Sequence, residues 1–391
     1  MLPDEENESL PLDQQEGYED LDLNADWFVG PTLWSTDWTT ETVVSQLRRG
    51  NINLNPRYQR RNAWDTKRKS YFIESLILGL PVPQIILAEE KGKKGSFVVI
   101  DGKQRLLTLR QFLAKSDDVE FPQLKLTGLD DRAELNGLTY EALQDDLRFR
   151  DELNNFENQT VRTVVIRGWK SEKYLYSVFL RINTGSVQLS PQELRQALHP
   201  GEFSNFIDDF SYESIPLKRA MKLREPDFRM RDVELVLRYF AYRNFASRYS
   251  GDLKKFLDET TEIFNLEWSK SVAMLMEQGK SLEEALTSVR TIFGERDELR
   301  KWNGKTFERR INRAVFDIMA YYFSIPEIAD ASIAKSAQIK AEFQNLCEHN
   351  REFVASIEST TKSIDANRQR FGIWASALSA ITGLDVRSPI A

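Results

Sequence analysis

The sequence has one cysteine and two histidines among 391 residues, and this scarcity excludes several kinds of site. A single cysteine, Cys347, cannot form an internal disulfide or a cysteine-rich zinc site. We expect it to be a small buried side chain in a helix. The two histidines, His199 and His349, lie far apart, so the chain has no HExxH protease motif and no zinc deaminase motif.

Long apolar runs are also absent. No stretch reaches the roughly 18 apolar residues that indicate a transmembrane helix. The acidic N-terminus has neither the basic segment nor the apolar segment of a secretory signal. We therefore expect a cytoplasmic protein without a membrane partner.

Basic residues are missing from the start of the chain. Residues 1–47 hold 12 acidic residues and no lysine or arginine, so the other 344 carry 53 basic against 48 acidic residues, a net charge of +5. We predict an acidic, largely disordered tail over 1–34. This tail either keeps the protein soluble or mimics a phosphate backbone and competes with nucleic acid for the basic remainder of the chain. The overall pI of 5.3 therefore does not exclude DNA or a nucleotide as a ligand.

Hydrophobic periodicity predicts two domains after the tail, an α+β domain over 35–200 and an all-α domain over 201–391. Strands are predicted at 97–100 and 160–166, an apolar run lies at 84–87, and helices are expected between these segments. The aromatic stretch at 27–38 is interpreted as a segment that docks on the fold. In the second domain we expect helices over 231–248, 252–277, 281–300, 306–323, 333–361 and 366–382.

The most informative segment is Asp-Gly-Lys-Gln-Arg at 101–105, between a predicted strand and a predicted helix. Gly102 permits a sharp turn, and a helix N-terminus attracts phosphate. Asp101 could hold Mg²⁺ or orient a water. Such turns are also common in α/β domains with no site. The catalytic candidates are Asp101, Gln104 and Arg105, and the phosphate-binding candidates here are Gly102, Lys103 and Thr108.

A second cluster lies at 57–69, where six basic residues face one acidic residue. It could be a solvated basic surface. The aromatic residues Tyr58 and Trp64 among the arginines instead favour a surface that binds phosphate and stacks a base. The candidates from this cluster are Arg57, Gln59 and Arg60.

A third cluster runs from Phe179 to Arg195. Ser190-Pro191-Gln192-Glu193 is a capping box that predicts a helix start. The preceding residues could simply link two helices. Their candidate phosphate ligands are Arg181, Asn183, Thr184 and Arg195, and Glu193 joins Asp101 as a candidate metal ligand.

Taken together and in order, these three clusters resemble the ParB/sulfiredoxin-like domain that forms the N-terminal part of GmrSD-type restriction enzymes. The resemblance covers about residues 35–245, and its Asp-Gly-Gln-Gln-Arg motif has Lys103 in place of the first glutamine. It implies a domain that binds a nucleoside triphosphate with Mg²⁺, in prokaryotic defence against foreign DNA. By motif match, Asp101, Gly102, Gln104 and Arg105 would contact phosphate and metal. Arg60 and Arg181 would neutralise the triphosphate, and Asn183 would orient it.

Three functions follow from these patterns. The first is a sensor that binds, and hydrolyses, a nucleoside triphosphate in an anti-phage, restriction-like system. The second is a metal-dependent DNA nuclease that uses Asp101 and Glu193 at the same site. The third is a non-catalytic module that binds DNA or a partner.

Many relatives carry a C-terminal His-Asn-His nuclease, and this sequence lacks that motif. Its partners are therefore expected to be DNA and a separately encoded nuclease or other defence subunit, and the chain could itself be a homo-oligomer. In the second domain, a helical stripe of four basic residues could be a solvated face or contact the DNA backbone. These residues are Lys305, Arg309, Arg310 and Arg313.

Overall fold

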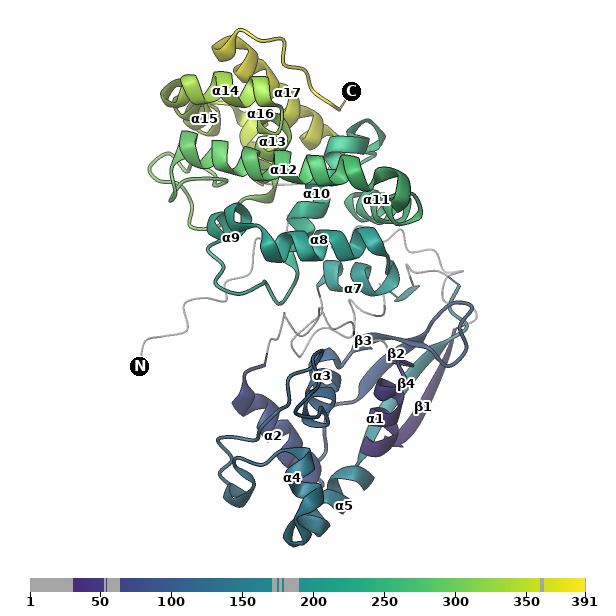
Figure 1. The fold of residues 1–391 in the computed structure, drawn as a ribbon. Coiled ribbons are helices and arrows are strands. Elements are labelled where there is room, and N and C mark those ends of the chain that lie inside the picture. Colours follow the sequence, from purple (N-terminus) through teal and green to yellow (C-terminus); the bar gives the residue numbers. More distant parts are fainter. Residues whose placement is uncertain are drawn as a thin grey trace. The chain divides into compact units, whose positions relative to one another are not determined.

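The computed structural model describes residues 31–52, 54, 64–170, 174–175, 178, 190–358 and 362–390. The chain divides after Leu198 into two compact units (Figure 1). The first is a small sheet with helices, and the second contains helices joined by loops. This confirms the predicted fold class, α+β followed by all-α. Within the described ranges, no helix is long and apolar enough to cross a membrane.

The first unit alternates short helices with the four strands of one sheet. Its elements are β1 (Thr32–Thr39), α1 (Thr40–Arg48), α2 (Thr66–Ile77), β2 (Ile85–Glu89), β3 (Phe97–Asp101), α3 (Lys103–Phe112), α4 (Tyr140–Asp145), α5 (Arg150–Asn158), β4 (Thr160–Arg167) and α7 (Pro191–Leu198). The strand order is β1-β4-β2-β3, so β4, the last strand in the chain, lies inside the sheet. It pairs antiparallel with β1 and parallel with β2.

Each face of this sheet is covered by its own apolar core. On one face, Leu87, Val99 and Val165 pack with buried residues of α1, α2, α3 and α5. On the other, Ile86 and Ile100 pack with Leu194 of α7. This alternation along β2 and β3 is the period of two that a strand buried on both faces requires. The sheet therefore fixes α3 and α7 on opposite faces of the same strands.

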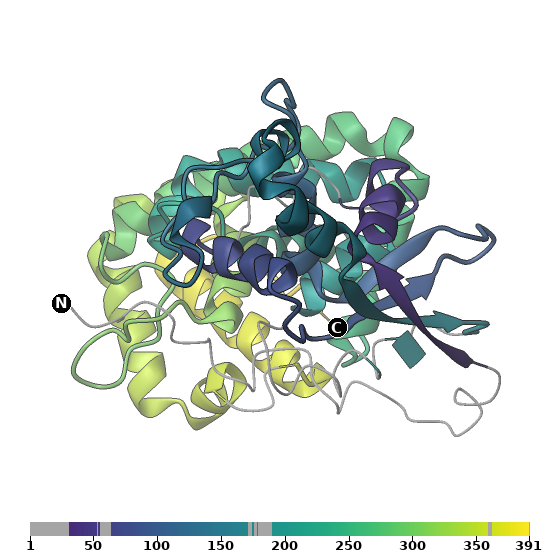
Figure 2. The same cartoon turned by 90° about the horizontal axis from the view of Figure 1, so that it is seen from below.

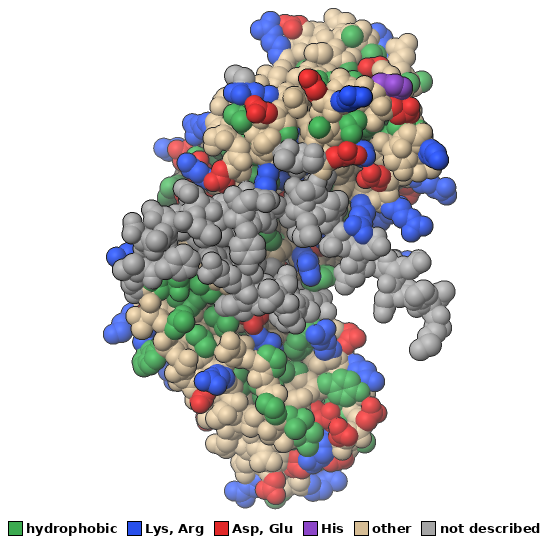
Figure 3. All heavy atoms as spheres, turned by 180° about the vertical axis from the view of Figure 1, so that it is seen from behind, with side chains coloured by type: hydrophobic (Ala, Val, Ile, Leu, Met, Phe, Trp, Pro, Cys, Tyr) green, Lys and Arg blue, Asp and Glu red, His purple; other side chains and the backbone are tan. Residues whose placement is uncertain are grey.

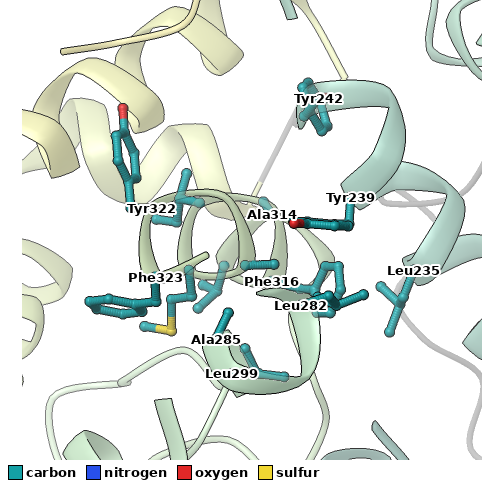
Figure 4. Packing of buried hydrophobic residues seen from close by; sticks show 14 of the residues in the cluster. Leu235, Tyr239, Tyr242, Leu282, Ala285, Leu299, Ala314, Phe316, Tyr322 and Phe323 are labelled. Carbon is teal, nitrogen blue, oxygen red and sulfur yellow. The ribbon is translucent and has the colours of Figure 1, made fainter. Parts of the chain in front are cut away.

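The second unit is helical throughout its regular elements. These are α8 (Glu202–Glu213), α9 (Ile215–Met221), α10 (Arg231–Phe245), α11 (Leu253–Leu266), α12 (Trp268–Phe293), α13 (Arg313–Phe323), α14 (Pro326–Ala334), α15 (Ser336–His349), α16 (Arg351–Glu358) and α17 (Ile364–Thr382). One continuous core joins them, with Tyr239 of α10, Leu282 of α12 and Phe316 of α13 near its centre (Figure 4). Cys347 is buried as expected, and so are Tyr322, Phe371 and Trp374.

Several predicted helix boundaries in this unit are wrong. The helix expected over 252–277 is interrupted at Glu267. The next helix, α12, then continues through Gly279, where the sequence predicted a gap between two helices. Gly279 is retained inside α12 because a Cβ there would lie 3.0 Å from Phe210 Cε2 of α8. The predicted helix 333–361 is divided among α14, α15 and α16.

The predicted basic stripe is also wrong. The helix expected over 306–323 begins only at Arg313, because the Asn312 side chain caps it by accepting from Val315 N. Lys305, Arg309 and Arg310 therefore precede the helix. Arg313 itself is 2% exposed, with its Nε 3.2 Å from Glu234 Oε1. The four residues do not form one helical face. On the face of the molecule in Figure 3, basic and acidic side chains of the described residues are interspersed.

Candidate functional site

The turn from β3 into α3 is built as the sequence predicts. β3 ends at Asp101, and Gly102 follows with φ 100°, in the left-handed region that favours glycine. A Cβ at Gly102 would lie 3.2 Å from Ile85 Cγ1 and 3.3 Å from Arg105 Nη2. Both the backbone angle and the close approach therefore require glycine. Because glycine has no side chain to cap α3, the partial positive charge of its N-terminus stays available.

Arg105 holds the carboxylate at the end of the strand. Its Nη2 lies 2.9 Å from Asp101 Oδ2 and 3.0 Å from the Gln84 carbonyl oxygen. The Arg105 side chain is 7% exposed and that of Asp101 16%. The pair thus joins the end of β3 to the segment before β2, and it fixes the guanidinium in one orientation.

Two buried polar atoms at this turn have no hydrogen-bond partner within the part of the chain that the structure describes. They are Gln104 Oε1, an acceptor, and Arg105 Nε, a donor. Buried polar groups in folded proteins are nearly always paired, and these two lie in the first turn of α3, so they are candidates for ligand contact. By contrast, the hydroxyl of Thr108 donates to the Gln104 carbonyl oxygen at 2.7 Å, inside α3.

Lys103, the first residue of α3, forms a buried ion pair with Glu193 of α7. The distance from Lys103 Nζ to Glu193 Oε1 is 2.5 Å, and both side chains are 5% exposed. The other carboxylate oxygen of Glu193 accepts from Ser190 N at 2.8 Å, while Ser190 Oγ accepts from Glu193 N. The predicted capping box is therefore present. One carboxylate closes the start of α7 and neutralises Lys103 at the start of α3.

The two basic side chains at the turn, Lys103 and Arg105, are each paired with a carboxylate, Glu193 and Asp101 respectively. Arg195 is buried on α7, and its Nη1 donates to Gln192 Oε1 at 2.7 Å. Among the described residues there is no group of three or more His, Cys, Asp or Glu that could hold a metal ion.

The remaining predicted site residues lie outside the described ranges. They are Arg57, Gln59 and Arg60 of the second cluster and Arg181, Asn183 and Thr184 of the third. The structure brings together Asp101, Gly102, Lys103, Gln104, Arg105 and Glu193 from regions 90 positions apart in the chain.

Sequence reasoning missed the pairing of Lys103 with Glu193 and the contact of Arg105 with the Gln84 carbonyl. The sequence signal at Glu193 concerns only its own helix: it is the last residue of the capping box, where a glutamate normally turns back to the helix start. The backbone contact to Gln84 has no such signal, because any residue provides a carbonyl oxygen.

The helical unit contains a buried ionic network that the sequence did not indicate. Asp317 accepts from Arg238 Nε at 2.8 Å and from Arg370 Nη2 at 3.1 Å, and all three side chains are at most 4% exposed. The hydroxyl of Tyr242 donates to Asn367 Oδ1 next to Arg370. Burial raises the pKa of Tyr242 to about 12. This network joins α10, α13 and α17.

One comparison with known proteins gives a match, and it covers most of the first unit. A family model described as GmrSD restriction endonuclease, N-terminal domain, matches residues 41–200. This confirms, for that part of the chain, the resemblance drawn from the three motifs. Searches of curated proteins and of solved structures found no match.

Proposed function

We propose that the turn from β3 into α3 binds and hydrolyses a nucleoside triphosphate, in a sensor subunit of a DNA-directed defence system. The observation that carries this proposal is the unpaired state of Gln104 Oε1 and Arg105 Nε, both buried at a helix N-terminus. A buried polar group without a partner costs about 1–3 kcal/mol. A ligand with a phosphate oxygen for Arg105 and an O–H group for Gln104 recovers that cost.

The two atoms suit different parts of the reaction. Arg105 Nε–H donates, so it fits a phosphate oxygen and stabilises the charge that develops there. Gln104 Oε1 accepts, so it fits the attacking water, as glutamines do in other nucleotide hydrolases. The water oxygen attacks the γ-phosphorus and the β–γ bridging bond breaks. The products are a nucleoside diphosphate, inorganic phosphate and a proton. Asp101, held by Arg105, would bind Mg²⁺ or orient the water, and the proton leaves to solvent.

The residues fit Mg²⁺ as an ion that arrives with the nucleotide. Mg²⁺ commonly uses one or two carboxylates together with substrate phosphates and waters. Asp101 can supply one carboxylate, because only its Oδ2 is engaged by Arg105 among the described residues. Both oxygens of Glu193 are engaged, by Lys103 and by Ser190 N, so this carboxylate fits a metal less well. When bound, Mg²⁺ would neutralise negative charge on the phosphates.

The remaining candidates complete the proposed phosphate site. Arg60 and Arg181 would neutralise the triphosphate, Asn183 would orient it, and Arg57, Gln59 and Thr184 would add contacts. Gly102 lets the phosphate approach the backbone at the start of α3. Arg195, buried on α7, adds positive charge to the site.

DNA and a separately encoded nuclease are the proposed partners. These 391 residues hold no His-Asn-His motif, so they do not themselves supply that cutting chemistry. A nuclease at the site itself would need two convergent carboxylates free to hold metal. Here both carboxylate oxygens of Glu193 are engaged, by Lys103 and by Ser190 N, so only Asp101 can serve. The arrangement favours phosphoanhydride hydrolysis over DNA cleavage.

The test is phosphate release from each of the four ribonucleoside triphosphates with Mg²⁺, with and without DNA. It compares the wild type with Asp101→Ala, Arg105→Ala and Gln104→Leu. The matched control is Arg110→Ala, because Arg110 lies at the other end of α3 and pairs with Asp118 outside the site. We expect the first two variants to lose turnover by about 100-fold or more, and Arg110→Ala to retain it.

Two results would redirect the proposal. Nucleotide binding without phosphate release in the wild type would make the site a binding module. Mg²⁺-dependent DNA cleavage that is lost in Asp101→Ala would instead support the nuclease alternative.

A further inference from the structure

The outer edge of β1 is free of partners among the described residues. β1 is an edge strand, paired only through β4 on its inner side. It is eight residues long, and Leu33 and Trp34 are 62% and 53% exposed. An exposed edge strand of this length invites pairing with another strand, and proteins usually shorten, charge or cover such edges. Asp37 is the only charged residue in β1.

The direction of the backbone groups along β1 follows from its pairing with β4. Thr40 N donates to the Gln159 carbonyl oxygen, in line with the β1–β4 register, which places Thr36 opposite Thr163. Backbone groups of an antiparallel strand point alternately to either side. The N–H and C=O groups of even-numbered residues therefore face β4, and those of residues 33, 35, 37 and 39 face outward.

We propose that β1 pairs antiparallel with β1 of a second copy of this chain, about a two-fold axis at Thr36. In this register Thr36 lies directly opposite Thr36 of the second copy. The outward N–H and C=O groups of Ser35 then pair with those of Asp37 in the second copy. The two four-stranded sheets then become one sheet of eight strands. The proposal does not depend on the nucleotide site.

The side chains select this register over its neighbours. With the axis at Thr36, Trp34 of each copy lies opposite Trp38 of the other, so the symmetry gives two equivalent tryptophan pairs. Aromatic pairs across neighbouring strands stabilise sheets. An axis at Asp37 would place two carboxylates opposite each other, which is unfavourable. An axis at Ser35 would place each tryptophan opposite a threonine and leave the aromatic pairs unformed. Registers shifted by one residue would bring inward-facing backbone groups to the interface.

The two tryptophans are already oriented for such a contact. Trp38 packs at its inner end against Phe97, with ring centroids 5.9 Å apart. The Arg167 guanidinium lies 3.9 Å from the centre of the Trp34 ring. The rings therefore sit on one face of the sheet, in fixed positions, with Trp34 still more than half exposed. Figure 2 shows β1 in purple at the margin of the strands.

The first experiment measures the mass of the full chain by light scattering over a range of concentrations. We expect the wild type to approach twice 45.4 kDa as concentration rises. Ser35→Pro removes an N–H that faces outward and leaves the β4 ladder intact, so it should restore the single mass. A wild type of single mass at every concentration would overturn the proposal, as would a Ser35→Pro variant that remains a dimer.

The second experiment tests the register by disulfide cross-linking under mild oxidation. Thr36→Cys places two thiols at directly opposed positions with Cα atoms about 4.5 Å apart, within disulfide range. Ser35→Cys is the matched control, because its thiols would lie two residues out of register. The native Cys347 is buried and does not interfere. We expect a covalent dimer from Thr36→Cys alone; equal cross-linking of both variants, or of neither, would contradict the register.

Discussion

Lys103 and Glu193 lie 90 positions apart and form an ion pair of 2.5 Å with both side chains 5% exposed. Each belongs to the first turn of a helix, α3 or α7, and these helices lie on opposite faces of the sheet. The pair therefore crosses from one face to the other at the end of β3. It ties the candidate site to the last helix before the helical unit.

Removing one partner of this pair should be costly. Lys103→Met leaves a buried carboxylate and Glu193→Gln leaves a buried ammonium, so each single variant should lose about 3–5 kcal/mol of unfolding free energy. The double variant should lose less than the sum, because it buries neither of the two charges. Urea denaturation of the four proteins measures this cycle.

The control for this cycle is the pair of Lys93, which is exposed, and Glu90, which is half-buried, at 3.1 Å. Lys93→Met and Glu90→Gln should each change stability by less than about 1 kcal/mol. If the Lys103 and Glu193 variants behave like these, the buried pair does not hold α7 to the site.

Gln104→Leu should separate stability from ligand binding. It removes the buried, unpaired Oε1, so the protein without ligand should gain roughly 1 kcal/mol of unfolding free energy. Nucleotide binding should weaken, because the acceptor for the reacting water is lost. Thermal denaturation and calorimetric titration with a non-hydrolysable nucleotide measure the two effects.

Gln111→Leu is the matched control on the same helix. Gln111 Oε1 is also buried and unpaired among the described residues. This variant should gain similar stability and retain normal nucleotide affinity. Equal loss of affinity in both variants would assign the effect to α3 packing and not to the site.

The network around Asp317 should dominate the stability of the helical unit. Asp317→Ala leaves the buried guanidinium groups of Arg238 and Arg370 without their carboxylate, at an expected cost of about 3–5 kcal/mol. Chemical denaturation followed by tryptophan fluorescence detects this loss. Asp365→Ala, at an exposed position paired with Arg368, should change stability by less than about 1 kcal/mol. A small effect of Asp317→Ala would mean that water enters and solvates the network.

Alkaline pH should destabilise the folded chain in part through Cys347. Burial raises the pKa of this thiol to about 12, from an ordinary value of 9.0. Between these values the unfolded chain loses the proton and the folded chain keeps it, so stability present below pH 9 declines as the pH rises toward 12. The decline should be shallower in Cys347→Ala. At pH 8 a thiol reagent should modify only unfolded protein; fast labelling of the native chain would contradict this burial.

Much of the first unit could be predicted from the sequence because its signals are local. Phe97–Ile100 is a short apolar run, and Asp-Gly after it marks the turn. The capping box marks the start of α7. β1 was missed because Thr32–Thr39 is an exposed edge strand, so its side chains show no alternation of apolar and polar residues. What makes it a strand is its pairing with β4, whose residues come more than 120 positions later in the chain.

The errors in the helical unit have the same physical origin. Arg313 and Arg370 look like surface residues in the sequence, yet both are buried against carboxylates from other helices. A charge is tolerated inside a protein when its partner comes from elsewhere in the fold, and a linear pattern does not show that partner. Likewise, Lys103 and Glu193 were assigned separately to phosphate and metal, since only the fold brings them into contact.

The position of β4 has a consequence for how the protein folds during synthesis. β1 and the β2–β3 hairpin are made long before β4, yet β4 separates them in the sheet. Neither can complete its backbone pairing until residue 167 has left the ribosome, and the closing contacts span large loops. Sheets with such distant pairings form slowly and leave strand edges open meanwhile. The nascent chain is therefore most exposed to aggregation between the synthesis of β3 and that of β4, the interval in which chaperones would have most effect.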